Sequence, residues 1–142
     1  AFDVAPVETT LDRVDELLSK DYKNIVLLLL DGMGISTMEK LLDKEGAFRS
    51  HLLFPYSSVF PATTVAATTS VLSALSPLSH CWLGWDNYYP DLNENVTVFL
   101  NRVQGTERIA ASFRVAEHYT PYKSIISLIN ENGGKAFFHL LL

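Results

Sequence analysis

The sequence predicts an α/β fold, a three-layer sandwich in which helices flank a mostly parallel central sheet. Two apolar runs, residues 23–30 and 135–142, have the length and aliphatic content of strands that are buried on both faces. Helical patterns neighbour both runs, and such alternation is typical of a sheet covered by helices. In these sheets, ligands bind at the carboxyl ends of the strands.

The first part of the chain alternates helical and strand patterns. Residues 9–20 predict a helix, because leucine and valine recur on one face at helical spacing. The strand over residues 23–30 follows, and residues 36–44 then predict a second helix that Gly46 ends. The side chains expected to face inward on this second helix are Met38, Leu41 and Leu42.

The pattern continues beyond this helix. Residues 56–60 predict a strand, and a helix of small residues is expected from Thr63 or Thr64 to about Leu75, where Pro77 prevents continuation. Residues 80–106 read as irregular chain with turns. Residues 122–134 predict a last amphipathic helix, ended by Gly133, before the strand over residues 135–142. Its expected buried side chains are Ile125, Ile126, Leu128 and Ile129.

Composition narrows the classes of protein to which the chain can belong. Its 142 residues suit one domain, and 48% hydrophobic residues suffice for a packed core. A net charge of −5 argues against nucleic acid or an anionic membrane as a partner. The single cysteine, Cys81, permits no internal disulfide, and no basic and apolar leader is apparent, so we expect a cytoplasmic protein.

Asp31 is the first candidate for chemistry. It follows the apolar run directly and precedes Gly-Met-Gly, so the predicted fold places it at the carboxyl end of a strand. A carboxylate there can hold a divalent cation such as Zn²⁺ or Mg²⁺. The alternative is that Asp31 only starts a turn or caps the next helix.

Thr64 is the second candidate. It lies where a helix is expected to begin, inside a stretch without any charged residue between Arg49 and Asp86. A helix N-terminus binds phosphate well, and a metal can activate a threonine hydroxyl for attack on phosphorus. The alternative is that Thr63 or Thr64 is an ordinary N-cap within a tightly packed helix.

Together these stretches resemble the alkaline phosphatase superfamily. The sequence "LLLLDGMG", followed by "FPATTVAATTSVLSALSPLSH", is similar to its type I phosphodiesterase/nucleotide pyrophosphatase branch, over roughly residues 24–142. The resemblance implies an alkaline-phosphatase-like fold with two divalent metal ions, Zn²⁺ being favoured. It makes Asp31 and Thr64 metal ligands and Thr64 the nucleophile of a covalent phospho-enzyme, with Thr63 as the runner-up.

The chain also departs from that family. Cys81 and Ala74 stand where the family usually has glycine, and Ala67 stands where the nucleotide pyrophosphatases often have a phosphate-binding Asn. The family's later Asp and His ligands are missing, because no Asp follows Asp91 and only His118 and His139 remain. We therefore expect an N-terminal fragment of a larger hydrolase domain, inactive by itself.

Four aromatic residues follow the Pro-Leu-Ser-His sequence that ends at His80. His80 itself is expected to be structural, within a turn. Trp85 and Tyr88 are candidates to stack against a nucleobase or another substrate group, although a hydrophobic lid is an equally good interpretation. The four aromatic residues are Trp82, Trp85, Tyr88 and Tyr89.

We thus expect a metal-dependent hydrolase of phosphoric esters, with a small phosphodiester or nucleotide pyrophosphate as substrate. One alternative is a phosphomonoesterase or mutase of the same superfamily. A sulfatase is disfavoured because no Arg follows Thr64 before Arg102. The other alternative is a non-catalytic α/β binding module. A sheet edge uncovered in a fragment would favour self-association, so an oligomer is compatible with the sequence.

Overall fold

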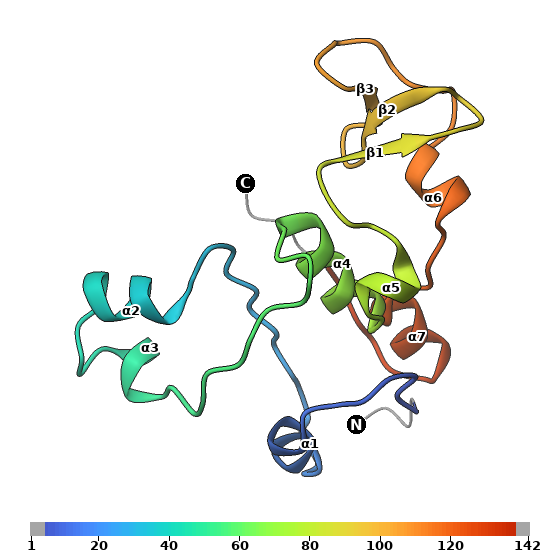
Figure 1. Ribbon diagram of the computed structural model, residues 1–142. Coiled ribbons are helices and arrows are strands. Elements are labelled where there is room, and N and C mark those ends of the chain that lie inside the picture. The colour runs from blue at the N-terminus through green and yellow to red at the C-terminus, as the bar shows by residue number, and fades with distance from the viewer. Residues whose placement is uncertain (1–4, 139–142) are drawn as a thin grey trace. The chain divides into compact units, whose positions relative to one another are not determined.

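The computed structural model describes residues 5–138 and divides the chain into two compact units (Figure 1). One unit is residues 24–58, which contains α2 (Ile35–Leu41) and α3 (Ala47–Ser50). The other joins the chain up to Lys23 with the chain from Val59 onward. Its elements are α1 (Asp12–Leu18), α4 (Thr64–Ser73), α5 (Pro77–His80), β1 (Asp86–Tyr89), β2 (Glu94–Thr97), β3 (Arg102–Val103), α6 (Val115–Tyr119) and α7 (Ile125–Glu131).

Three of the predicted helices are confirmed within their expected ranges, as α1, α4 and α7. Thr63 and Ser124 each cap a helix by accepting a hydrogen bond from the backbone N–H three residues later. Such caps satisfy backbone donors that the first turn leaves without a partner. Polar caps therefore set the starts of α4 and α7, and Gly133 follows α7 with φ +84°.

The prediction for the second helix was wrong at its end. α2 stops at Leu41, because Leu42 is already extended, and Gly46 is instead the residue before α3. The Asp43 side chain accepts from the Glu45 amide at 3.1 Å, which favours a turn over another helical turn. Leu41 is 75% exposed rather than inward, whereas Met38 and Leu42 are half-buried.

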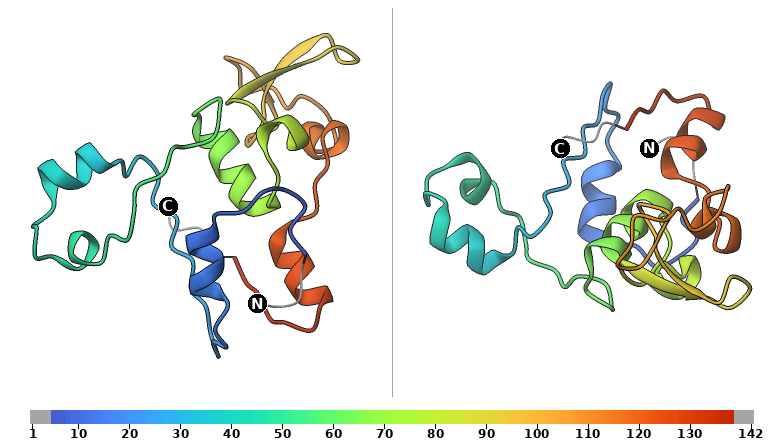
Figure 2. Two further views of the ribbon diagram at one scale, coloured as in Figure 1. Left: turned by 60° about the horizontal axis from the view of Figure 1, so that its bottom comes forward. Right: turned by 90° about the horizontal axis from the view of Figure 1, so that it is seen from above.

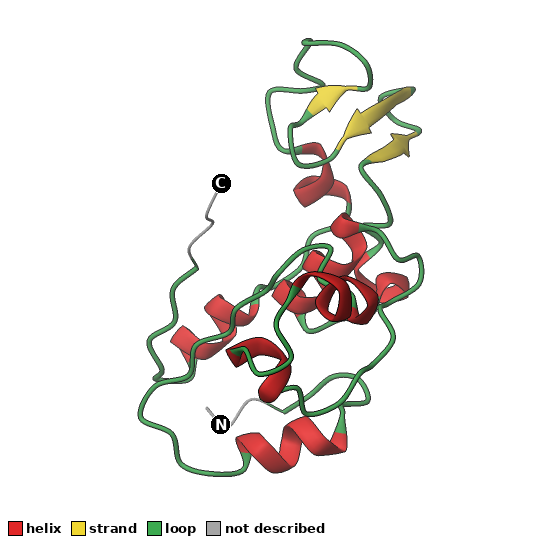
Figure 3. Cartoon of the chain, turned by 90° about the vertical axis from the view of Figure 1, so that its left-hand side faces the viewer, coloured by secondary structure: helices red, strands yellow, loops and turns green. Residues whose placement is uncertain are grey.

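None of the three predicted strands is paired in the described part of the chain. Residues 24–30 form neither helix nor strand, and the segments 56–60 and 135–138 also belong to no sheet (Figure 3). The last four residues of the expected final strand, including His139, lie outside the described residues. The parallel three-layer sandwich therefore stays a prediction.

The described sheet lies where irregular chain was expected. β1, β2 and β3 form an antiparallel sheet in that order, with Tyr89 opposite Glu94 and Val96 opposite Val103. Each connecting turn ends in an asparagine with positive φ, Asn93 at +51° and Asn101 at +56°. Asparagine tolerates this conformation better than most residues, so the two turns explain why the chain reverses here.

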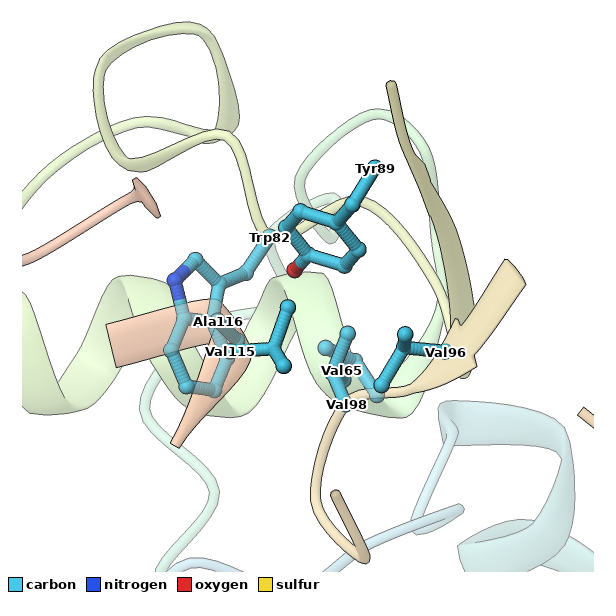
Figure 4. Close-up of a cluster of buried hydrophobic side chains, with 7 residues drawn as sticks. All are labelled: Val65, Trp82, Tyr89, Val96, Val98, Val115 and Ala116. Carbon is cyan, nitrogen blue, oxygen red and sulfur yellow. The ribbon is translucent and has the colours of Figure 1, made fainter. Parts of the chain in front are cut away.

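The core joins α4, the sheet and α6. Val65, Val96 and Val115 are fully buried, and Trp82 packs beside them at 3% exposure (Figure 4). Complete burial of an aliphatic or aromatic side chain stabilises a fold by about 1.5–3 kcal/mol. This cluster therefore fixes the N-terminal end of α4 against the sheet. Its members are Val65, Trp82, Tyr89, Val96, Val98, Val115 and Ala116.

Two further helices pack against α4. Both α5 and α7 lie beside it in the two views of Figure 2. Thr69 and Ser73 are buried on α4, and the Ser73 hydroxyl donates to the Thr69 carbonyl at 2.7 Å. The Ser73 hydroxyl can be buried because the helix backbone accepts its hydrogen bond, whereas the buried Thr69 hydroxyl has no hydrogen-bond partner in the described part of the chain. The charge-free composition of this stretch thus reflects a helix that is covered on several sides.

Candidate functional site

Thr64 is the first residue of the ten-residue helix α4. Its side chain is half-buried, and the neighbouring Val65 is fully buried in the core. The start of the helix is therefore held by packing as well as by its cap. An α-helix carries partial positive charge at its N-terminus, which favours an anion there.

The hydroxyl of Thr63 is occupied by two hydrogen bonds. It accepts from the Ala66 amide at 3.1 Å and donates to the Leu83 carbonyl at 2.8 Å. A nucleophilic hydroxyl must pass its proton to a base, and a backbone carbonyl accepts a hydrogen bond but does not take up the proton. This geometry argues against Thr63 as the nucleophile.

Two residues that depart from the pattern of the resembled family have a left-handed backbone conformation. Ala74 ends α4 with φ +56°, and Cys81 ends α5 with φ +59°. Both are left-handed conformations, in which glycine is favoured because it has no Cβ. These are the two positions at which the resembled family usually has glycine. The backbone therefore supplies a physical reason for glycine at both positions.

His80 is structural in this fold, but it is the last residue of helix α5 and does not lie in the turn that was expected. It is 2% exposed, and its Nδ1 accepts from the Trp82 amide at 3.0 Å. A neutral ring with an unprotonated Nδ1 carries its proton on Nε2, so Nε2 donates to Ser70 Oγ at 3.0 Å. His80 therefore cannot act as a base toward Ser70. Burial lowers the pKa of His80, against the opposing effects of the Ala66 carbonyl and the Glu8 charge.

Asp31 lies in the 24–58 unit, whereas Thr64 belongs to the other unit. Its side chain is exposed, and it begins a turn in which Gly32 has φ +69°. The Gly34 amide donates to the Gly32 carbonyl at 3.0 Å and α2 follows. A Cβ at Gly32 would have no other atom within 4 Å, so a lack of space does not explain the glycine. The left-handed backbone of the turn favours glycine at this position. This placement fits the turn interpretation, and the metal-ligand role of Asp31 stays a prediction.

A complete metal site is not formed by residues 5–138 alone. Among them, no three His, Cys, Asp or Glu side chains come together in a way that could hold an ion. Structural and catalytic zinc sites use three or four such ligands. The donors within the described residues therefore do not fit a two-metal centre without further ligands.

The four aromatic residues divide into a buried pair and an exposed pair. Trp82 and Tyr89 are core residues, and the Trp82 indole donates to the Thr120 carbonyl at 2.9 Å. Trp85 is 51% exposed and Tyr88 56% exposed. Tyr88 and Tyr89 face opposite sides because successive side chains alternate along a strand. Of these four, only Trp85 and Tyr88 keep an accessible ring for a ligand.

Each exposed aromatic residue is held by a neighbour. The Trp85 ring meets Phe99 edge to face, with ring centroids 5.7 Å apart. The Tyr88 hydroxyl donates to Asn93 Oδ1 at 2.8 Å. Such contacts reduce the rotational freedom that a ligand would otherwise have to remove. Both side chains are therefore suited to present a ring to a planar group.

Two cavities are lined by other residues. One of about 420 Å³ lies between α2 and α3 and includes Met38 and Arg49. The other, of about 640 Å³, includes Tyr122 and Lys123 beside α7. Neither of the two is lined by a candidate site residue. The candidate site is thus defined by the start of α4 and not by either cavity.

Glu8 takes part in the structure at the start of helix α5, a role that its sequence position did not reveal. Its carboxylate accepts from the Ser76 amide at 2.9 Å and from the Ser79 hydroxyl at 2.7 Å. The bond from the Ser76 amide, followed by that from Ser79, lowers the pKa of Glu8. A contact across nearly seventy residues leaves no local sequence signal, so only the folded chain reveals it.

Comparison with known proteins found no protein-family model, no curated protein and no solved structure that matches this chain. Within residues 5–138, the helices are all too short or too polar to cross a membrane.

Proposed function

We propose that the chain belongs to a hydrolase of phosphoric esters in which Thr64 is the nucleophile. The substrate is a small phosphodiester or a nucleotide pyrophosphate, and Asp31 serves as a metal ligand. The position of Thr64 as the first residue of α4, directly after a separate N-cap, is the observation that carries the proposal. A capped helix of this length directs its N–H groups and its partial positive charge toward an anion at its start.

The left-handed residues support the match of this chain to the family pattern. Ala74 and Cys81 have positive φ at the positions where the pattern calls for glycine. This agreement concerns backbone conformation, whereas the resemblance was drawn from side-chain identity. It supports the register that places Thr64, rather than Thr63, at the nucleophile position.

The chemistry that Thr64 would perform has two steps. Its Oγ forms a bond to phosphorus while the bond from phosphorus to the leaving oxygen breaks. The hydroxyl proton is transferred overall to the leaving oxygen, which departs as an alcohol or a phosphate. Water then attacks the phospho-threonine, its oxygen enters the phosphate product, and Thr64 regains its proton. The sum is hydrolysis of one phosphate ester or anhydride bond.

The proposal requires more ligands than residues 5–138 bring together. Divalent metal ions, when bound, lower the pKa of a coordinated hydroxyl and neutralise developing charge. The described donors do not complete such a site. In the proposal, Asp31 is therefore one of several metal ligands, and Thr64 carries out the bond-forming step.

The test is turnover of bis(p-nitrophenyl) phosphate by the native full-length protein and by its Thr64→Ala variant. We expect the variant to lose at least about 10³-fold in kcat, because the covalent step has no other nucleophile. Acid quenching followed by mass spectrometry should locate a phosphoryl adduct on Thr64 in the wild type.

Thr106→Ala is the matched control. It removes a hydroxyl that donates to the Val103 carbonyl at 2.9 Å, outside α4, and it should leave kcat unchanged. Equal activity of wild-type protein and Thr64→Ala would contradict the proposal. Faster turnover of p-nitrophenyl phosphate than of the diester would favour the phosphomonoesterase alternative.

The exposure of Trp85 and Tyr88 supports the second candidate, a non-catalytic binding module. Stacking on exposed rings requires no nucleophile. Quenching of tryptophan fluorescence by AMP, without any turnover of the diester, would favour this module over the enzyme.

A further inference from the structure

We propose that Thr63 is a positioning residue that fixes Thr64 in the orientation for attack. This inference rests on the proposed function, because it assigns Thr63 a task only if Thr64 is the nucleophile. The starting observation is that one hydroxyl group makes two hydrogen bonds of opposite direction, to Ala66 and to Leu83.

The bond from the Ala66 amide fixes the first turn of α4. The Thr63 carbonyl also accepts from the Ala67 amide at 2.9 Å, so two successive amides of the helix bind to this residue. Thr63 itself is extended, with φ −106° and ψ 154°. The backbone therefore changes direction between Thr63 and Thr64, and the cap determines where that change occurs.

The bond to the Leu83 carbonyl adds an anchor from outside the helix. It joins the start of α4 to the chain twenty residues later, between Trp82 of the core and the exposed Trp85. An ordinary cap needs only the bond within its own helix. The second bond ties the Thr63 side chain to that segment and so opposes a shift of the first turn relative to it.

Small displacements of a nucleophile are costly to a reaction. A misplacement of about 1 Å can reduce a rate on the order of 100-fold, even when the substrate still binds. Loss of the Thr63 hydroxyl should therefore lower kcat more than it changes KM. The position needs a hydroxyl and not a threonine methyl group, since only the oxygen takes part in the two bonds.

The test compares Thr63→Val with Thr63→Ser in the native full-length protein, with bis(p-nitrophenyl) phosphate as substrate. Thr63→Val keeps the shape of the side chain but removes both hydrogen bonds. We expect kcat to fall on the order of 10- to 100-fold with KM within about threefold. Thr63→Ser restores the hydroxyl and should recover most of the lost kcat.

Ser124→Ala is the matched control, because Ser124 caps α7 by accepting from the Ser127 amide at 3.1 Å. Thermal unfolding of all variants should show a similar loss of stability for Ser124→Ala and Thr63→Val, while kcat falls only for the latter. Equal losses of kcat in both variants would show a general effect of stability and overturn the inference.

Three further results would each overturn it. Full activity of Thr63→Val would remove the positioning role and leave the proposed function intact. A phosphoryl adduct on residue 63 in the wild type would make Thr63 the nucleophile itself. A wild-type protein without any turnover of the diester would reject the proposed function, and the role of Thr63 with it.

Discussion

At the scale of single residues, left-handed backbone conformations carry much of the local structure. Ala74, Cys81, Asn93 and Asn101 all have positive φ, and each lies where an element ends or a strand reverses. Asparagine tolerates this conformation, whereas alanine and cysteine are destabilised in it because their Cβ lies close to the backbone carbonyl oxygen. The strain is therefore concentrated at Ala74 and Cys81.

Cys81→Gly should stabilise the protein. Glycine adopts φ +59° without a steric penalty, so the free energy of unfolding should rise by about 1 kcal/mol. The measurement is urea unfolding followed by tryptophan fluorescence. Cys81→Ala is the control: it also removes the thiol, which lies 3.5 Å from the Leu78 carbonyl, but it keeps the strained Cβ. If the alanine variant were as stable as the glycine variant, a left-handed Cys81 would be excluded.

At the scale of elements, His80 joins two helices and the chain that follows them. It ends α5, its Nε2 bonds Ser70 on α4, and its Nδ1 accepts from the Trp82 amide. Because a backbone amide can only donate, a proton on Nδ1 would break the bond to Trp82. The neutral form of the ring is thus the form that the fold requires.

Stability should therefore fall as the pH decreases below 6.5. The pKa of His80 is lowered in the folded state, mainly by burial, so the unfolded chain takes up a proton that the folded chain resists. The stability that neutral His80 contributes is complete above pH 6.5, which is its pKa in the unfolded chain. It declines as the pH falls toward the lower pKa of the folded state. Urea midpoints between pH 7 and pH 5 should decrease more for wild type than for His80→Asn.

Glu8, whose charge acts on His80, affects stability in a lower pH range. The pKa of Glu8 is lowered from 4.5 by the bonds from Ser76 and Ser79, so its contribution is lost only at lower pH. Measurements above pH 5 therefore report on His80. An identical pH dependence in wild type and His80→Asn would show that the histidine is not held neutral.

At the scale of the whole molecule, the apolar run Ile25 to Leu30 is where sequence and structure differ most. These six side chains are between 39% and 90% exposed, and the run forms no strand within the described residues. Their burial in a sheet would contribute roughly 10 kcal/mol at about 1.5–3 kcal/mol per side chain. We therefore keep the proposal that the native protein buries this run in a mostly parallel sheet.

Val26→Lys tests that proposal in the native full-length protein. If the run is buried, a charge at this position should lower the free energy of unfolding by about 3 kcal/mol or more. Val7→Lys makes the same change at a residue that is 77% exposed and should cost less than about 0.5 kcal/mol. If Val26→Lys and Val7→Lys both changed the urea midpoint equally and only slightly, a buried strand at this run would be rejected.

The local structure of this protein follows in large part from its sequence. Helix α1 was predictable from apolar spacing, α4 from a threonine at its start, and α7 from apolar spacing and Gly133, because these signals act within one or two turns of chain. The cap of α1 was not predictable, since this helix begins after Leu11 without a side-chain cap. The antiparallel sheet was missed, although Asn93 and Asn101 are its turn signals, because its strands are only two to four residues long. Strands this short show little alternation.

The candidate site was likewise predictable only in part. Thr64 at the start of a helix was predictable, since a proline and two threonines precede a run of small helical residues. The division of the aromatic residues into buried Trp82 and exposed Trp85 was not, because it depends on which faces the sheet and α6 cover. The two bonds of Thr63, and the contact of Glu8 with Ser76, likewise join distant segments.

The sequence by itself determined that helices lie over α1, α4 and α7 and that a threonine begins α4. Each of these depends on steric and hydrogen-bonding preferences within a few residues. Only the tertiary structure decided that His80 is neutral and buried, that Thr63 has no spare proton to transfer, and which aromatic rings face outward. These properties arise when packing removes water and brings together groups that the sequence holds far apart.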